Sequence, residues 1–251
     1  MRAIILAAGR GSRLQQTADR QLPKCLLTFG GRSLLERHLR LLAAAGVEEI
    51  VLALGFRHEL IEAELARLGW RGRVEIVLNP RHELGSMFTV HSVAQPLTRG
   101  GDVLLMDADV LYDERIMTAL AADRRPVNRV LIDRDFEAGD EPVKVCVLAG
   151  VPIELRKQLE PGLKYDIIGE SVGFFRFDER ASRRLAAIVE DHVASSRAHL
   201  PHEEAVRELL RERSQSIEVC DVTGAPWIEI DFPADVVRAT EEVLPQLETR
   251  F

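Results

Sequence analysis

Residues 6–14 read Leu-Ala-Ala-Gly-Arg-Gly-Ser-Arg-Leu, and residues 22–27 read Leu-Pro-Lys-Cys-Leu-Leu. The run at residues 2–6 is apolar and is expected to form the first strand. Glycines directly after a strand let backbone N–H groups approach phosphate oxygens closely. A solvated surface turn is the alternative for such a loop, and the Pro23-Lys24 pair about ten residues on weighs against it. The stretch therefore predicts a phosphate-binding loop.

Two familiar phosphate-binding motifs do not fit this loop. A Walker P-loop requires Gly-Lys-Ser/Thr, and the chain contains no Gly-Lys pair. A dinucleotide fingerprint requires a third glycine, where Leu14 stands, and an acidic residue ending the second strand, where Leu54-Gly55 stands. What remains is a glycine loop with four cations of its own, namely Arg10, Arg13, Arg20 and Lys24.

The charge of the chain is divided unevenly. Its 33 Lys and Arg residues and 40 Asp and Glu residues give a net charge of −7. Residues 1–24 hold five basic residues and one acidic residue, so this segment carries +4 and the rest carries −11. A net acidic chain disfavours a general nucleic-acid binder, which needs a basic balance to hold phosphates. The basic segment is where a small polyanion is expected.

Composition and cysteine usage indicate a folded protein of a reducing compartment. Hydrophobic residues make up 46% of the chain and charged residues 29%, a balance typical of globular proteins. Cys25, Cys146 and Cys220 lie too far apart for a disulfide framework or a Cys-x-x-Cys metal pair. The apolar N-terminal run is short for a signal peptide, and no segment has the roughly 20 apolar residues of a membrane span. We expect a cytoplasmic protein without a membrane partner, and a homodimer remains open.

The periodicity of the chain predicts an α/β fold. In the first half, strand-like runs at residues 2–6, 49–54, 74–78 and 102–106 alternate with helical runs at 33–45, 58–68 and 87–94. In the second half, residues 129–132, 143–148, 167–177, 216–219 and 227–230 are strand-like, and residues 179–194, 202–213 and 233–247 are helical. This order predicts one domain over residues 1–251, a three-layer sandwich with a mostly parallel, mixed sheet. Such sheets bind ligands at the carboxyl ends of their strands, where the strand order reverses.

The glycine loop with its Pro-Lys element resembles the signature of the nucleotidyltransferase superfamily, in which Gly9-x-Gly11-x-Arg13 precedes Pro23-Lys24. The resemblance implies a Rossmann-like fold and transfer of a nucleoside monophosphate to a phosphorylated acceptor, with release of pyrophosphate. It implies catalytic roles for Arg13 and Lys24, which would offset the charge of the two polyanionic reactants. It also implies a nucleotide site made by Leu6, Ala8, Gly9, Gly11, Ser12, Asn79, Gly85 and Ser86.

The same resemblance implies a Mg²⁺ site made of carboxylates. Asp109, just past the strand at 102–106, matches the family's first metal aspartate, and Asp231 matches the second. Asp107 is an alternative ligand or a neighbour that supports the ligands. The alternatives are an Asp pair that ends a strand for Asp107 and Asp109, and a helix-start carboxylate before Pro233 for Asp231.

The second half resembles phosphocholine cytidylyltransferases and related enzymes for small phosphoesters or phosphonates, through residues 141–145, 169–174 and 227–231. CTP is then the donor, and the acceptor is phosphocholine, aminoethylphosphonate or a similar compound of phosphonate or phospholipid-headgroup metabolism. A sugar or inositol phosphate is the alternative acceptor. Residues 82–87 lack the asparagines that phosphocholine relatives carry, which weighs against phosphocholine itself. The acceptor-binding candidates are Lys157 and Lys144 for its phosphate, and Glu170, Tyr165 and Trp227 for a cationic head.

Two functions of other classes compete with this interpretation. Gly169-Glu170-Ser171-Val172-Gly173 fits the nucleophile elbow of α/β-hydrolases, but the residues after Ser171 continue as a strand instead of a helix. A non-catalytic nucleotide sensor is the other alternative, and the retention of Arg13, Lys24, Asp109 and Asp231 weighs against it. The histidines form no His-Glu-x-x-His motif, so a zinc enzyme is unsupported.

Overall fold

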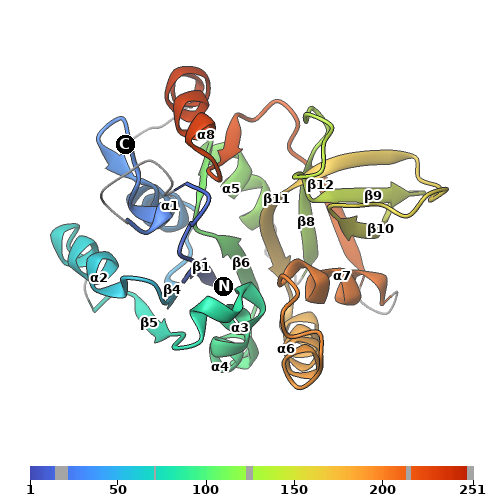
Figure 1. Cartoon of the computed structure of the whole chain (residues 1–251), viewed down its shortest axis with the longest axis horizontal. Helices are drawn as coiled ribbons and strands as arrows, with labels where there is room; N and C mark the ends of the chain where they lie inside the picture. The colour runs from blue at the N-terminus through green and yellow to red at the C-terminus, as the bar shows by residue number, and fades with distance from the viewer. Residues whose placement is uncertain (15–21, 71, 123–126, 213–215, 248–251) are drawn as a thin grey trace.

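The computed structural model describes residues 1–14, 22–70, 72–122, 127–212 and 216–247, and its elements are labelled in Figure 1. The loop cation Arg20 and the end of the helix expected over residues 202–213 lie outside these ranges. Among the described residues, no helix combines the length and the apolar character needed to cross a membrane.

Four parallel strands form the centre of the sheet. They are β1 (Arg2–Ala7), β4 (Glu49–Leu54), β5 (Glu75–Leu78) and β6 (Val103–Asp107), in the order β6-β1-β4-β5. The chain leaves β1 toward β4 and β5 and then crosses to β6 on the other side, so the strand order reverses between β1 and β6. The carboxyl ends of these two strands therefore border the crevice in which such sheets bind ligands.

The second half completes the sheet with mostly antiparallel strands. The long strand β11 (Ile167–Phe177) pairs with β6 through its end and with β9 (Lys144–Leu148) through its start. On its other side lies β8 (Asn128–Asp133), which pairs in parallel with β12 (Ile217–Asp221). One edge is β10 (Val151–Arg156), which the sequence pattern did not indicate. The mixed sheet that the sequence predicts is confirmed.

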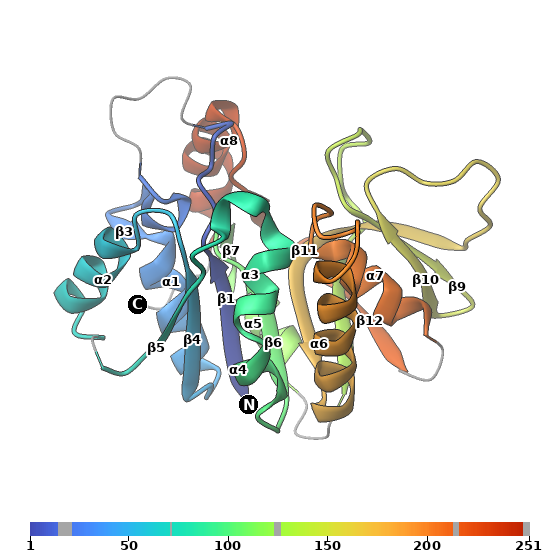
Figure 2. The ribbon, with the colours of Figure 1, turned by 60° about the horizontal axis from the view of Figure 1, so that its bottom comes forward.

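Helices cover both faces of the sheet, because alternate strand residues point to opposite sides. Ile5 belongs to the core under α1 (Leu34–Ala44), α2 (His58–Arg67) and α5 (Glu114–Ala121). Ile4 belongs to the core of the other face, which is covered by α3 (Ser86–Ser92), α4 (Ala94–Thr98), α6 (Glu179–Val193) and α7 (Glu203–Arg211). Figure 2 shows α3, α4 and α6 on the near side of the sheet. The expected three-layer sandwich is confirmed.

A third, smaller core holds the C-terminal segment against the rest. Two short antiparallel strand pairs contribute to it: β2 (Thr28–Phe29) with β3 (Arg32–Ser33), and β7 (Val110–Tyr112) with β13 (Trp227–Glu229), which is distant in sequence. The single helix expected over 233–247 is wrong. The segment forms three short pieces instead, namely α8 (Pro233–Arg238), a π turn (Ala239–Val243) and a 3₁₀ turn (Leu244–Gln246). Pro245 lacks the N–H that a continuous α-helix needs at that position.

Candidate functional site

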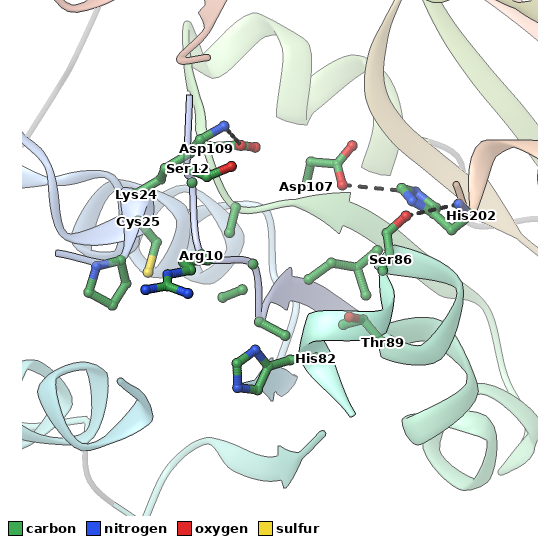
Figure 3. Close-up of a pocket in the computed structure, with 18 of the residues that line it drawn as sticks. Arg10, Ser12, Lys24, Cys25, His82, Ser86, Thr89, Asp107, Asp109 and His202 are labelled. Carbon is green, nitrogen blue, oxygen red and sulfur yellow. Dashed lines mark hydrogen bonds and ion pairs between the residues drawn. The ribbon is translucent and has the colours of Figure 1, made fainter. Parts of the chain in front are cut away.

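A cavity of about 610 Å³ opens at the carboxyl ends of β1 and β6, where the topology predicts a ligand site. Residues 6–12 and 23–25 line one side, and residues 107–109, the start of α3 and the start of α7 line the other. Figure 3 shows Lys24 and Asp109 together in the cavity, with Asp107, Ser86 and His202 across from Arg10 and Cys25. The glycine loop thus faces the aspartates that the sequence singled out.

Most of the expected nucleotide-binding residues meet at this cavity. Those that line it are Leu6, Ala8, Gly9, Gly11, Ser12, Gly85 and Ser86. Asn79 is not among the described lining residues; it is buried, and its side chain donates a hydrogen bond to Thr89 Oγ1 at 3.2 Å. Thr89 itself lines the cavity, so Asn79 supports the wall from behind.

Gly11 is required by the close approach of Lys24. Its φ of +61° is in the left-handed region, and a Cβ atom there would lie 2.9 Å from Lys24 Cγ. The glycine loop and the Pro-Lys element are therefore packed directly against each other. This contact places the lysine at the floor of the loop.

Three carboxylates gather beside the cavity. One oxygen each of Asp109, Glu229 and Asp231 lies within 4.8 Å of the others. They meet because β7 pairs with β13 and the Ile230 N–H donates to the Asp109 carbonyl at 2.9 Å. Carboxylate oxygens are the ligands that Mg²⁺ prefers, so the donor set fits the ion. Asp107 is not a member of this group.

Glu229 is a site residue that the sequence reasoning missed. The sequence feature that could have identified Glu229 is its position two residues before Asp231. Residues i and i+2 of an extended chain point to the same side, so the two carboxylates are expected to lie together. Desolvation by the surrounding protein raises the pKa of Glu229 well above its usual value, and Asp109 and Asp231 raise it further. Glu229 lines the wall of the cavity. Other unpredicted lining residues are Arg10, Cys25, His82, Thr89, His202 and Glu203.

Lys24 bridges the two aspartates that the sequence predicted as metal ligands. Its Nζ lies 2.8 Å from Asp109 Oδ2 and 2.6 Å from Asp231 Oδ1. Burial alone would lower the pKa of Lys24, but the two carboxylates outweigh it and hold the pKa above its usual value. The lysine is therefore a fixed cation at neutral pH.

Arg13 lies at the edge of the same cluster. Its guanidinium donates to Asp231 Oδ1 at 2.8 Å and to Glu141 Oε2 at 3.1 Å, and it stacks over the Phe232 ring at 5.2 Å. Lys157 Nζ donates to the same Glu141 oxygen at 3.0 Å. Glu141 thus joins Lys157 to the cations of the loop.

The two lysines proposed for the acceptor phosphate have different environments. Lys144 Nζ donates to the backbone carbonyls of Gly139 at 2.6 Å, Lys157 at 2.6 Å and Pro142 at 3.3 Å. The three N–H donors of its ammonium therefore join the segment before β9 to the end of β10. Within the described part of the chain, the ammonium of Lys157 contacts the Glu141 carboxylate alone, and its side chain is exposed, which leaves donors for a ligand.

The candidates for a cationic head do not gather in the cavity. Trp227 donates from Nε1 to Asp133 Oδ2 at 2.8 Å, and Glu170 pairs in register with Asp133. Burial raises the pKa of Glu170 to about 7, with a further contribution from Asp133. Tyr165 is exposed and is not among the described residues that line the cavity.

Asp107 forms a second cluster on the cavity wall, with the start of α7. Its Oδ1 lies 3.9 Å from His202 Nε2, and His202 Nδ1 lies 3.0 Å from Glu203 Oε2. Burial raises the pKa of Asp107 to about 7, with smaller contributions from neighbouring carboxylates. Burial would lower the pKa of His202, but Glu203 and Asp107 raise it to about 9. The cluster braces α7 against the end of β6.

The hydrolase interpretation fails on the backbone. Residues 167–177 form one strand, so Ser171 does not lie on the strand-to-helix turn that a nucleophile elbow requires. Ser171 is buried, and its Oγ accepts a hydrogen bond from the Gly173 N–H at 3.2 Å. Gly173 has a φ of +77°, and a Cβ atom there would lie 2.5 Å from Asp107 Oδ2. The glycine therefore makes room for Asp107.

Comparisons with known proteins agree with this geometry. Residues 3–217 match the family model of the MobA-like NTP transferase domain. A protein of Rubrobacter xylanophilus named bifunctional IPC transferase and DIPP synthase is 30% identical over 251 residues, covering 96% of this chain and 52% of that protein. The CMP-5'-(3-aminopropyl)phosphonate synthase of Streptomyces rubellomurinus is 26% identical over 265 residues, covering 99% and 40%. The chain thus spans about half the length of these relatives or less.

A solved structure shares the fold. The inositol-1-phosphate CTP transferase from T. maritima superposes with a TM-score of 0.72 at 22% identity, covering 93% of this chain and 90% of that one. At this identity the likeness supports the fold alone.

Proposed function

Because the chain belongs to the MobA-like NTP transferase family, we propose that it is a CTP-dependent cytidylyltransferase that joins CMP to a small phosphorylated or phosphonate acceptor. Family membership confirms the resemblance to nucleotidyltransferases. The choice of CTP and of this acceptor class is supported by two relatives, an IPC transferase and a CMP-phosphonate synthase. The observation that carries the proposal is the contact of Lys24 with both Asp109 and Asp231 beneath the glycine loop.

The cavity can hold a triphosphate by charge and by backbone donors. Residues 9–12 line the cavity, and Gly9 and Gly11 carry no side chain that would keep a phosphate away from the backbone N–H groups of this loop. Arg13 and Lys24 offer cationic donors at its edge and floor. In the proposed reaction an acceptor oxygen attacks the α-phosphorus in line, the bond to the bridging oxygen breaks, and pyrophosphate leaves with that electron pair. No protein nucleophile is needed.

The cluster of three carboxylates is the proposed metal site. Asp109, Asp231 and Glu229 would hold Mg²⁺, which would supply positive charge to the phosphate oxygens as a Lewis acid. The protein itself orients these carboxylates through the β7–β13 pairing. Asp235 adds to this order, because its carboxylate accepts from the Asp231 N–H at 2.9 Å.

For the acceptor we favour Lys157 over Lys144 as the phosphate-binding lysine. Lys157 adjoins Arg13 through their shared partner Glu141, whereas Lys144 is occupied by three backbone carbonyls. Lys157→Met should raise the KM for the acceptor about tenfold and change the KM for CTP little. Lys164→Met is the matched control, since Lys164 is an exposed lysine on the same connecting segment. Equal KM values in the two variants would exclude Lys157.

The activity is tested by measuring pyrophosphate release with each of the four NTPs, Mg²⁺ and a panel of acceptors. The panel holds phosphocholine, aminoethylphosphonate, inositol 1-phosphate and glucose 1-phosphate. Release that requires both CTP and one of the first three acceptors supports the proposal. Release only with a sugar 1-phosphate would place the chain with the sugar nucleotidyltransferases. CTP binding without release from any acceptor would favour a nucleotide sensor.

A further inference from the structure

His38 is a buried histidine on α1 that the proposed reaction does not use. Its side chain is fully buried, with Nε2 3.2 Å from the Ala108 carbonyl oxygen and Nδ1 3.2 Å from the Tyr112 hydroxyl. The ring also packs near Tyr112 and Phe174, at centroid distances of 5.3 and 6.1 Å. The histidine thus connects α1 with the segment that follows β6.

The partners of His38 determine its protonation. A carbonyl oxygen only accepts, so Nε2 must carry a proton and donate it to Ala108. Burial lowers the pKa of His38 to about 4, so the ring is neutral and Nδ1 carries no proton. Nδ1 must then accept from the Tyr112 hydroxyl. The result is a directed chain of two hydrogen bonds, from Tyr112 through His38 to the Ala108 carbonyl.

This chain ends between two functional carboxylates. Ala108 stands between Asp107, which faces His202, and Asp109, which meets Lys24. Tyr112 lies on β7 and pairs with Trp227 on β13, the strand that carries Glu229. The Asp109 carbonyl is held in turn by the Ile230 N–H. The peptide that sets the direction of Asp109 is therefore held on both sides by buried hydrogen bonds.

We propose that His38 and Tyr112 are positioning residues that fix the Ala108 peptide and so hold the Asp109 carboxylate toward Asp231 and Glu229. This inference rests on the metal site proposed above. Partners that orient ligands behind a metal site commonly change metal affinity or activity by 10- to 100-fold when they are removed. A histidine that only fills the core would affect stability alone.

The test compares four variants at a temperature at which all are folded. Tyr112→Phe removes only the hydroxyl, and His38→Leu removes both hydrogen bonds. His38→Gln keeps an amide that can donate to Ala108 and accept from Tyr112. Leu185→Ala is the control, because Leu185 is a buried residue of α6 in the core of the opposite sheet face. The readouts are Mn²⁺ affinity by electron paramagnetic resonance without nucleotide, and hydrogen exchange of residues 108–112, whose buried members belong to the other cores.

We expect Mn²⁺ to bind about 10-fold more weakly to Tyr112→Phe and His38→Leu, and His38→Gln to recover most of the affinity. Exchange of residues 108–112 should accelerate in the first two variants and change much less in Leu185→Ala. If Tyr112→Phe and His38→Leu keep wild-type affinity and exchange, the positioning role is overturned. If the wild-type protein binds no Mn²⁺ but the exchange result holds, the proposed metal site is overturned and the positioning of the Asp109 segment stands.

Discussion

Replacing Lys24 by methionine should change metal binding and catalysis in opposite directions. Methionine keeps much of the apolar stem of lysine and removes its charge. Lys24 Nζ lies 2.8 Å from Asp109 Oδ2 and 2.6 Å from Asp231 Oδ1, so a Mg²⁺ ion held by the same two carboxylates would lie within about 5 Å of the ammonium as it stands. At an effective dielectric near 20, the two cations would repel each other by about 7 kcal/mol at that separation. Lys24 and a divalent ion would therefore compete for the two carboxylates, and the ammonium would have to shift for the ion to be held.

Movement of the lysine relieves most of that repulsion, so only part of it appears in the affinity. We expect Lys24→Met to bind Mn²⁺ at least about tenfold more tightly without nucleotide, equivalent to about 1.4 kcal/mol. Its turnover should fall about 10²- to 10³-fold, because a cation that offsets phosphate charge in the transition state is lost. Titration calorimetry measures the first effect and pyrophosphate release the second.

Lys164→Met serves as the matched control for this variant, since it removes an equal charge from an exposed position. It should leave metal affinity and turnover within about threefold of wild type, because exposed charges are strongly screened. Weaker metal binding by Lys24→Met would refute competition between lysine and metal. Near-normal turnover would refute the catalytic role of Lys24.

Three further predictions concern the carboxylates, the buried histidine and the serine of the hydrolase-like motif. Asp109→Asn or Asp231→Asn should reduce pyrophosphate release at least about 10²-fold, and Glu229→Gln should weaken Mn²⁺ binding about tenfold because one of the three carboxylates is lost. His38 has a pKa of about 4 when folded and near 6.5 when unfolded, so its contribution to stability is present above pH 6.5 and is lost as the pH falls toward 4. Between pH 7.5 and pH 4.5, the free energy of unfolding in urea should fall by about 2–3 kcal/mol more for wild type than for His38→Gln. Equal falls in the two proteins would contradict the neutral buried ring. Ser171→Ala should keep transferase turnover within about threefold of wild type and lower the free energy of unfolding by about 1 kcal/mol. If the wild type hydrolyses esters and Ser171→Ala does not, the hydrolase interpretation would be supported instead.

The sequence predicted the main sheet because its strands carry strong local patterns. The four central strands are short apolar runs separated by amphipathic helices, so periodicity alone locates them. Strand β10 escaped notice because Pro152 lies within it, and a proline in a run argues against a strand. The buried Glu154 and its neighbour Arg156 find their charged partners on α7. Such pairing depends on contacts that no local pattern contains.

The candidate site was predictable in its charged residues and less so in their supports. Lys24, Asp109 and Asp231 stand in recognisable motifs, and the structure brings them together. Glu229 joins them only because the register of β13 against β7 directs it there. Lys144 is an equally plausible lysine by sequence, and only the fold shows that its donors serve backbone carbonyls. Register and hydrogen-bond partners are tertiary properties, so the sequence does not contain them in readable form.

The most direct test of the proposed activity is a ³¹P NMR spectrum of the reaction of CTP with aminoethylphosphonate, and of CTP with inositol 1-phosphate. With wild-type protein and Mg²⁺, we predict that signals of a new CMP–acceptor anhydride and of pyrophosphate grow together in equal amounts as CTP disappears. The same mixture with Asp109→Asn should remain unchanged. Loss of CTP without a CMP–acceptor signal, or equal product from wild type and Asp109→Asn, would contradict cytidylyl transfer at this site.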